Sequence, residues 1–423
     1  MNHFDLREGA LACESVSLAA IARAVGTPVY VYSTATLERH YQVFRDALTA
    51  HPALGSPAIA YAVKANSNLS VLATLARLGA GADTVSQGEI RRALAAGIPP
   101  ERIVFSGVGK TSEELAFALK AGVAQINVES EPELNRLTGV ARAVGFRPAV
   151  VIRVNPDVGA GGHAKISTGG HESKFGVSLA EAERLYRLAE TDDALNAVGL
   201  ACHIGSQITD LAPLEAAFGV MRDLVLRLRA QGLTVERLDL GGGLGVSYFN
   251  NPEPPSPRAF AAMAASVVGG LDVELAFEPG RVIAANAGVL VARVIHVHER
   301  PDGRRFAVLD AAMNDLIRPA MYEAYHDIRP VAPRPGESIG YDVVGPVCET
   351  GDTFTRDRLL PPLEADDLVA FMSAGAYGAV MSSEYNTRPL IPEVLVRGDA
   401  FAVVRARPSY EDMLSRETRA PWL

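Results

Sequence analysis

The sequence Ile59-Ala60-Tyr61-Ala62-Val63-Lys64 places a lysine directly after an apolar run. A strand that is buried on both faces has such a continuous run. Seven further runs follow, at 82–85, 103–105, 125–128, 149–154, 197–202, 237–240 and 273–277. Between them, apolar residues recur three and four positions apart, as in amphipathic helices. Strands that alternate eight times with helices predict a closed parallel (β/α)8 barrel of the TIM type, with an open doubly wound sheet as the alternative.

The pattern changes after Arg281. Strand-like runs then follow one another with only turns and loops between them, at 289–297, 306–310, 338–344, 368–373, 393–396 and 402–405. This pattern predicts a mostly antiparallel β domain. The N-terminal segment, with a predicted helix at 18–25 and a strand at 29–32, is expected to join it. We therefore expect a barrel over 36–285 and a β domain made of 1–35 and 286–423.

The composition is that of an ordinary globular protein, with 48% hydrophobic and 21% charged residues. A net charge of -9 argues against nucleic acid or an anionic membrane as a partner, because both attract basic surfaces. Cys13, Cys202 and Cys348 are odd in number and far apart, which favours a reducing cytoplasm over a disulfide framework. We expect neither a signal peptide nor a membrane span.

Catalytic side chains on such a barrel lie at the carboxyl ends of its strands. Lys64 follows the first run, where it either extends its aliphatic stem toward solvent or supplies an amine that forms a Schiff base. Polar or glycine-rich segments follow the last four runs, namely Asn155-Pro156-Asp157, His203-Ile204-Gly205-Ser206-Gln207, Gly241-Gly242-Gly243 and Glu278-Pro279-Gly280-Arg281. These segments are expected to meet at one end of the barrel.

The three glycines that begin at Gly241 are typical of an anion-binding loop, because their backbone N–H groups are unobstructed. A dinucleotide-binding motif would require a third glycine at position 246, where Val246 stands, so a dinucleotide site is disfavoured. The alternative to an anion-binding loop is a simple tight turn. A phosphate site together with a Schiff-base lysine suggests pyridoxal phosphate. Glu278 is the best-placed acid for the ring nitrogen. His203 would stack on the ring or be a hydrogen-bonded core residue.

Six motifs together resemble the diaminopimelate decarboxylases, within the alanine racemase-like (fold type III) class of pyridoxal-phosphate decarboxylases. They run in order over nearly the whole chain: Tyr61-Ala62-Val63-Lys64-Ala65-Asn66, His203-Ile204-Gly205-Ser206-Gln207, Gly241-Gly242-Gly243-Leu244-Gly245, Glu278-Pro279-Gly280-Arg281, Cys348-Glu349-Thr350-Gly351-Asp352 and Gly375-Ala376-Tyr377-Gly378. Each motif alone is weak evidence for the family, whereas the six in this order are strong evidence.

The resemblance implies a homodimer with sites at the subunit interface and pyridoxal 5'-phosphate as cofactor. Lys64 would hold the cofactor covalently, His203 would stack on its ring, and Glu278 would pair with the ring nitrogen. The phosphate would be bound by Ser206, Gly243, the backbone around Gly280, and Tyr377, with Arg281 in the same motif. Cys348 and Glu349 would enter the site from the partner subunit.

The substrate is expected to carry both charges at its far end, as meso-diaminopimelate does. In the family, Arg318 and Tyr322 join Arg281 and Tyr377 in binding a distal carboxylate, for which guanidinium is well suited. Glu349 would take the distal ammonium. A surface salt bridge is the alternative explanation of Arg318.

The resemblance implies decarboxylation at the D-centre of meso-2,6-diaminopimelate to give L-lysine and carbon dioxide, the last step of lysine biosynthesis. Cys348 is the expected proton donor, with Lys64 or His203 as alternatives. The loop 159–171 is expected to close over the site. Other hypotheses are a decarboxylase of another diamino acid or of carboxynorspermidine, a racemase, and a non-catalytic homologue. His296 and His298 have the spacing of metal ligands, but a third ligand is not apparent, and we expect no metal.

Overall fold

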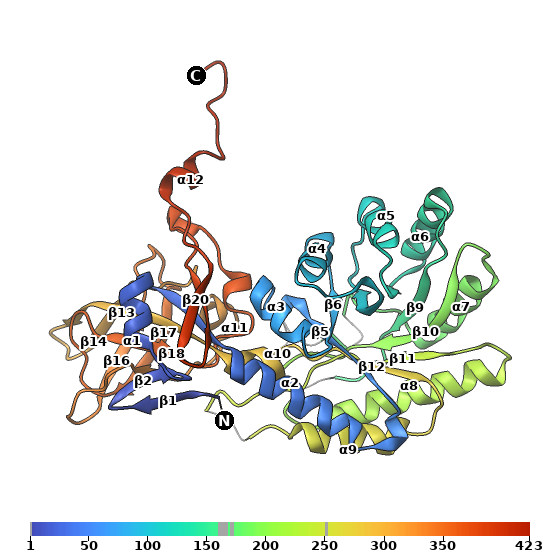
Figure 1. Ribbon diagram of the computed structural model, residues 1–423, viewed down its shortest axis with the longest axis horizontal. Coiled ribbons are helices and arrows are strands. Elements are labelled where there is room, and N and C mark those ends of the chain that lie inside the picture. Colours follow the sequence, from blue (N-terminus) through green and yellow to red (C-terminus); the bar gives the residue numbers. More distant parts are fainter. Residues whose placement is uncertain (1, 160–167, 170–172, 250–252) are drawn as a thin grey trace. The chain divides into compact units, whose positions relative to one another are not determined.

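The computed structural model describes residues 2–159, 168–169, 173–249 and 253–423. The chain forms two compact units. Glu38–Ser247 and Pro252–Ile283 make one, which we call the barrel; Met1–Leu37, Tyr248–Asn251 and Ala284–Leu423 make the other, which we call the β domain (Figure 1). Among the described residues, no helix combines the length and the apolar character that crossing a membrane requires.

The barrel is a closed parallel sheet of eight strands. The strands are β5 (Ala58–Ala62), β6 (Gly81–Thr84), β7 (Ile103–Phe105), β8 (Gln125–Val128), β9 (Ala149–Val154), β10 (Asn196–Cys202), β11 (Arg237–Asp239) and β12 (Glu274–Phe277). Each strand pairs with the next in sequence, and β12 pairs with β5 to close the ring. The predicted barrel is confirmed, and this closure excludes the open sheet.

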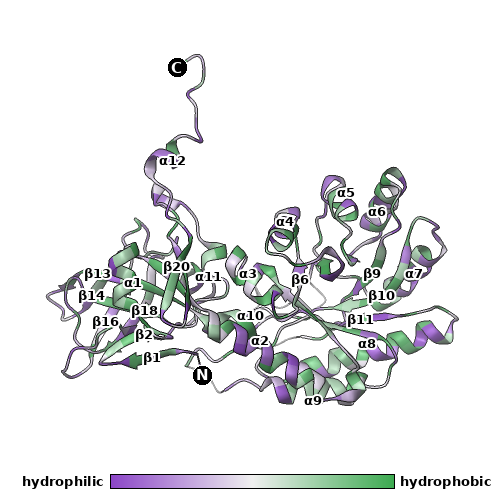
Figure 2. Cartoon of the chain, viewed as in Figure 1, coloured by the Kyte–Doolittle hydropathy of each residue, from purple (hydrophilic) through white to green (hydrophobic). Residues whose placement is uncertain are grey.

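Helices follow the strands. A serine, threonine or asparagine side chain caps the start of most of them, and apolar faces hold them to the sheet. They are α3 (Leu69–Ala76), α4 (Gln87–Ala95), α5 (Ser112–Ala121), α6 (Glu131–Val144), α7 (Leu179–Thr191), α8 (Ala212–Ala230), α9 (Pro257–Val268) and α10 (Arg281–Ala284), with α2 (Thr34–Thr49) before β5. Thr111, for example, caps α5 with a reciprocal capping box. Helix α8 buries Phe218 and Met221 and keeps hydrophilic residues on its other side (Figure 2).

The first strand ends earlier than its apolar run suggests. Strand β5 stops at Ala62, and Val63–Ala65 form a single turn of 3-10 helix. Lys64 therefore lies in a turn after the strand. The turn packs closely against the end of β12, since a Cβ added to Gly280 would lie 2.9 Å from the Ala62 Cβ and 3.1 Å from the Ala65 Cβ.

The β domain contains a nine-stranded sheet and a small three-stranded one. Its elements are β1 (Phe4–Arg7), β2 (Ala10–Cys13), β3 (Val16–Ser17), α1 (Leu18–Val25), β4 (Val29–Ser33), β13 (Gly288–Glu299), β14 (Arg305–Leu309), α11 (Arg318–Tyr322), β15 (Ile328–Pro330), β16 (Ile339–Val344), β17 (Thr353–Leu360), β18 (Leu368–Phe371), β19 (Glu393–Arg397), β20 (Ala400–Arg405) and α12 (Tyr410–Leu414). The mostly antiparallel character is confirmed, as is the participation of the N-terminal segment through β4, which pairs with β13.

Some of this domain differs from the sequence prediction. Two strand pairs are parallel, β14 with β16 and β4 with β19. Strands β1, β2, β3, β15 and β17 have no counterpart among the predicted runs. Strand β17 (Thr353–Leu360) contains three charged residues and leaves Leu359 exposed, so it lacks the apolar pattern on which the prediction relied.

Candidate active site

Lys64 forms an ion pair with Asp83 at the end of the barrel where the strands terminate. The Lys64 Nζ lies 2.7 Å from the Asp83 Oδ2. The Asp83 side chain is fully buried in β6, whereas the Lys64 side chain is 34% exposed. Lys64 is therefore held by a buried carboxylate and does not simply extend into solvent. Sequence reasoning missed Asp83, although an acid inside the apolar run 82–85 was a visible signal.

One cavity of about 430 Å³ brings three of the predicted residues together. Lys64, His203 and Glu278 line it, from the ends of three different strands. Arg153 and Asn127, which the sequence analysis did not single out, line it as well. The arrangement combines an amine, an imidazole and a carboxyl group around a space large enough for a small organic molecule.

His203 is a neutral imidazole with a defined tautomer. The Gly242 N–H donates to the His203 Nδ1 over 3.2 Å, so the ring proton resides on Nε2. Burial, Lys64 and Arg153 lower the His203 pKa well below its usual value. The half-buried ring therefore remains uncharged near neutral pH and is suited to lie against an aromatic surface.

Glu278 lies at the end of β12 beside a second buried acid, Asp239 of β11. Each carboxyl group affects the pKa of the other. Burial raises the pKa of Glu278 well above its usual value, and the Asp239 charge adds to this effect. Within the described part of the chain, the Glu278 Oε1 has no hydrogen-bond partner. A buried polar atom without a partner on a cavity wall is a candidate ligand contact.

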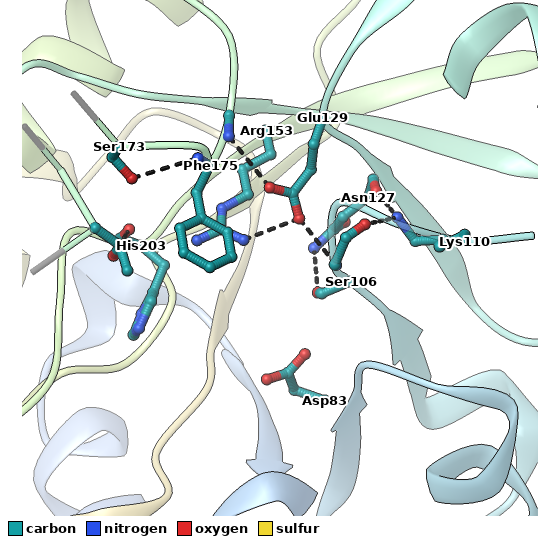
Figure 3. A network of polar contacts seen from close by, with 12 residues as sticks. Asp83, Ser106, Lys110, Asn127, Glu129, Arg153, Ser173, Phe175 and His203 are labelled. Carbon is teal, nitrogen blue, oxygen red and sulfur yellow. Dashed lines mark hydrogen bonds and ion pairs between the residues drawn. The ribbon is translucent and has the colours of Figure 1, made fainter. Parts of the chain in front are cut away.

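A polar network forms the wall of the cavity on the side of β7, β8 and β9 (Figure 3). Arg153 pairs with Glu129 over 2.9 Å and lies over the Phe175 ring, with 5.0 Å between the Arg153 Cζ and the ring centroid. The Lys110 Nζ lies 2.5 Å from the Glu133 Oε1 and also donates to the backbone carbonyls of Gly107 and Asn127. The Asn127 Nδ2 donates to the Ser106 Oγ over 3.0 Å. These contacts hold the wall rigid.

The predicted phosphate residues of the barrel also lie together. Arg281, which is buried, donates from Nη2 to the Ser206 Oγ over 3.0 Å. A Cβ added to Gly243 would lie 2.7 Å from the Gly205 carbonyl, so that loop approaches the Ser206 loop closely. The three glycines do not all offer free donors, because the N–H groups of Gly241 and Gly242 donate to the side chains of Asp239 and His203.

Arg318 of the β domain is buried, which contradicts the surface salt bridge considered for it. Its guanidinium lies over the Tyr248 ring, with 4.8 Å between the Arg318 Cζ and the ring centroid. The His326 Nδ1 faces the Met372 carbonyl at 2.9 Å and must donate to it, so the His326 Nε2 accepts from the Arg318 Nη1 over 2.9 Å. The guanidinium is thus fixed in position without losing its charge.

Cys348 and Glu349 lie on an exposed turn between β16 and β17. The Cys348 N–H donates to the Asn386 Oδ1 over 3.2 Å, and the nearby Glu349 carboxylate raises the pKa of Tyr385. Buried Asp352 anchors the turn by accepting from the Val347 N–H over 2.7 Å.

The remaining predicted residues of the β domain are two tyrosines, both half-buried. Tyr322 ends α11, and Tyr377 has a left-handed backbone with φ of 55°.

The loop predicted as a lid, 159–171, lies largely outside the described residues, which omit 160–167 and 170–172. Thr168 is described, and its Oγ1 donates to the His203 carbonyl over 2.7 Å. His296 and His298 are exposed on β13, and the described residues contain no group of three or more His, Cys, Asp or Glu placed to hold a metal ion.

Comparison with protein families assigns the barrel to a class. The family described as pyridoxal-dependent decarboxylase, pyridoxal binding domain, matches residues 35–285. This stretch includes Lys64, His203 and Glu278, the three predicted residues that line the cavity.

Full-length relatives are more specific. The chain is 49% identical to the diaminopimelate decarboxylase of Zymomonas mobilis, with 99% of each chain covered, and 49% identical to that of Vibrio cholerae over the whole of both. The structure of the Helicobacter pylori diaminopimelate decarboxylase complexed with L-lysine has a TM-score of 0.90 at 40% identity, covering 94% of this chain and 98% of that one. The M. jannaschii enzyme in co-complex with L-lysine has a TM-score of 0.94 at 34% identity, with full coverage of both chains. The chain belongs to the diaminopimelate decarboxylase family of pyridoxal-dependent decarboxylases.

Proposed function

We propose that this chain decarboxylates meso-2,6-diaminopimelate at its D-centre and releases L-lysine and carbon dioxide. The observation that carries the proposal is the cavity at the carboxyl end of the barrel, where Lys64, His203 and Glu278 converge. Family membership supports the same reaction, because the full-length relatives are named for it.

The residues around the cavity fit pyridoxal 5'-phosphate. The unpartnered Glu278 Oε1 is a suitable contact for a protonated ring nitrogen, and the neutral His203 imidazole is suited to a ring face. Gly243 and Gly280 lie where a Cβ would collide with neighbouring protein atoms, so both positions require glycine for the close approach of the loops that would surround the phosphate. When bound, the cofactor supplies an electron-withdrawing ring that accepts the electron pair left by carbon dioxide.

The chain's own groups then have distinct roles. Lys64 would hold the cofactor through its amine, while the Asp83 carboxylate positions that amine. Glu278 would face the ring nitrogen and His203 the ring. The phosphate would be held by Ser206, Gly243, Gly280, Arg281 and the Tyr377 hydroxyl.

The substrate's far end would be bound by groups of both signs. Arg318 is buried and held by His326 and Tyr248, which suits two-point binding of a distal carboxylate. Tyr322, Arg281 and Tyr377 would complete the carboxylate site, and Glu349 would accept the distal ammonium. A decarboxylase of ornithine or lysine has no use for a buried arginine at this place, since its substrate ends in an ammonium alone.

The proton that replaces the carboxylate would come from the Cys348 Sγ. A thiol gives up and recovers a proton near neutral pH more readily than a hydroxyl does. His203 is less suited to this role, because burial keeps it uncharged with its only ring proton on Nε2. Lys64 remains the second candidate.

A homodimer would complete the site. Cys348 and Glu349 are exposed in the single chain, which suits residues that serve a partner's barrel. The β domain also exposes apolar side chains on β20 and beyond, among them Phe401, Val403, Leu414 and Trp422. Exposed apolar side chains of this kind are typical of interfaces. We place the enzyme in the cytoplasm, because its three cysteines are free.

Product analysis by mass spectrometry tests the function. The purified enzyme, loaded with pyridoxal phosphate, receives a mixture of meso-diaminopimelate, L-ornithine, L-lysine and carboxynorspermidine. The proposal predicts that L-lysine accumulates at the expense of diaminopimelate alone. Appearance of a diamine or a polyamine would refute the substrate assignment, and absence of any product would favour a non-catalytic homologue.

A further inference from the structure

An imidazole and a phenol ring hold the Arg318 guanidinium in the β domain. The Arg318 Nη1 lies 2.9 Å from the His326 Nε2, and the Arg318 Cζ lies 4.8 Å from the centroid of the Tyr248 ring. The rings of His326 and Tyr248 meet edge to face, with 5.5 Å between their centroids. In the barrel wall, by contrast, Arg153 is paired with the Glu129 carboxylate. An imidazole orients a guanidinium without neutralising it, whereas a carboxylate partner cancels the charge that an anionic ligand would meet.

The hydrogen bonds of His326 define its protonation state. The Met372 carbonyl can only accept a hydrogen bond, and it lies 2.9 Å from the His326 Nδ1, so this nitrogen carries a proton. The Arg318 Nη1 can only donate, so the His326 Nε2 that faces it carries none. His326 is therefore a neutral imidazole, and the lone pair on its Nε2 points at the guanidinium.

The backbone around His326 is fixed on both sides. The Met372 N–H, directly after β18, donates to the Asp327 carbonyl over 2.8 Å. The Arg358 Nη1 donates to the His326 carbonyl over 3.1 Å. Strand β15 begins directly after Asp327 and pairs with β18. The buried acceptor of Arg318 is thus attached to the sheet of the β domain.

We propose that His326 is a positioning residue that orients Arg318 toward the distal carboxylate of the substrate and so determines the selectivity for substrates that carry this group. A guanidinium stands on a long flexible side chain, and it binds a carboxylate at two points only when its plane is held. The His326 Nε2 and the Tyr248 ring hold that plane from two directions. The inference rests on the proposed function, because it takes Arg318 as the group that binds the distal carboxylate.

Two amines measure what the distal carboxylate contributes to binding. L-Lysine and cadaverine differ only in this carboxylate. Each is titrated as an inhibitor of the enzyme loaded with pyridoxal phosphate, with meso-diaminopimelate as the substrate. The selectivity is the inhibition constant of cadaverine divided by that of L-lysine, and for the wild type we expect a ratio of about 10 or more.

Two variants separate the acceptor role of His326 from a merely structural one. In His326→Asn, the amide N–H replaces the Nδ1–H that faces Met372, and nothing replaces Nε2. In His326→Gln, the amide oxygen replaces Nε2 as the acceptor for Arg318. We expect His326→Asn to lower the ratio about 10-fold by weakening L-lysine alone, and His326→Gln to stay within about 3-fold of the wild type. Tyr325→Phe, a change in the same segment that keeps the ring against Arg358, is the control and should leave the ratio unchanged.

A double variant tests whether His326 acts through Arg318. In the Arg318→Lys protein, the further change His326→Asn should not alter the ratio, because the group that His326 orients is already gone. An additional loss of selectivity there would contradict the positioning role.

The outcomes separate this inference from the proposed function. An unchanged ratio in His326→Asn would overturn the inference, as would equal weakening of both amines. If His326→Asn does not fold, His326→Gln decides, because a folded variant that has lost the selectivity contradicts the acceptor role. A wild-type ratio near one would also overturn the inference, while formation of L-lysine from diaminopimelate by the same preparation would leave the reaction itself intact. Failure to form L-lysine would refute the proposed function.

Discussion

The barrel surrounds its charged side chains with buried partners, whereas the β domain exposes two of the side chains assigned to the reaction. In the barrel, three cations each meet a buried carboxylate: Lys64 with Asp83, Lys110 with Glu133 and Arg153 with Glu129. In the β domain, Arg318 is buried, but Cys348 and Glu349 lie on a turn that solvent reaches. The barrel groups therefore have buried partners within one chain, whereas the turn with Cys348 and Glu349 is exposed and, in the proposed dimer, would meet the partner's barrel.

This difference indicates a division of work. Groups that tune a cofactor need a water-poor setting, because electrostatic effects are strong there. Groups that meet the substrate must be reached by it and, in the proposed dimer, must extend toward a second subunit. We therefore expect changes in the barrel to affect the cofactor or the fold, and changes in the β domain to affect turnover or selectivity.

The largest effect is expected for Lys64→Ala. Loss of the amine that holds the cofactor should lower kcat on the order of 10⁴-fold, as loss of a central catalytic group commonly does. Carbon dioxide release measures kcat, and the absorbance spectrum of the protein reports the covalently held cofactor. Lys120→Ala, an exposed lysine at the end of α5, should change neither. Substantial residual activity of Lys64→Ala would contradict the assignment.

A large effect on stability is expected for Glu133→Ala in the barrel wall. The change leaves the Lys110 ammonium buried without its carboxylate, which costs about 3–5 kcal/mol of unfolding free energy. Denaturant titration measures the loss. Glu131→Ala on the same helix breaks an exposed pair with Arg184 and should change stability little. Equal losses of unfolding free energy in the two variants would show that burial of the Lys110–Glu133 pair does not affect stability.

Cys348→Ala should lower kcat by about 10²- to 10³-fold with little change in KM, because it removes a proton donor and no binding contact. Steady-state kinetics with diaminopimelate checks this split, and Thr350→Ala on the same turn serves as the control. If kcat of Cys348→Ala stays within a factor of a few of the wild-type value, Cys348 is not the proton donor and Lys64 takes that role.

The smallest of these effects is expected for Arg318→Lys. A lysine keeps the charge but loses the planar fork, so KM for diaminopimelate should rise about 10-fold while kcat falls less. Arg329→Lys, whose side chain is 41% exposed and pairs with Asp327, is the matched control. An unchanged KM in the Arg318 variant would show that Arg318 does not bind the distal carboxylate of the substrate.

Much of the fold was predictable, because burial on both faces gives each barrel strand a continuous apolar run. Runs such as 103–105 and 149–154 match β7 and β9 residue for residue. The glycine and histidine motifs after the later strands indicated which end of the barrel carries the site. Strand β17 was not predictable in this way, since its charged residues hide the alternation.

The missed site residues share one cause. Asp83, Asp239 and Arg153 lie inside apolar runs, whereas the site was predicted from the residues that follow each run. Their meaning depends on the register between neighbouring strands, which brings Asp239 to Glu278 and Asp83 to Lys64. Register in a closed barrel follows from tilt and stagger, which one sequence does not reveal. A charged residue within a buried run was nonetheless a usable signal, since such a charge needs a partner.

Coexpression of Lys64→Ala and Cys348→Ala subunits with different tags tests the central claim, that the exposed turn of one subunit completes the barrel of another. Purification through both tags isolates the mixed dimers. If each site combines one barrel with the partner's turn, one of two sites is intact, and the mixed dimer should have about half the wild-type activity. If each site belongs to a single subunit, every site is defective, and the mixed dimer will be as inactive as its parents.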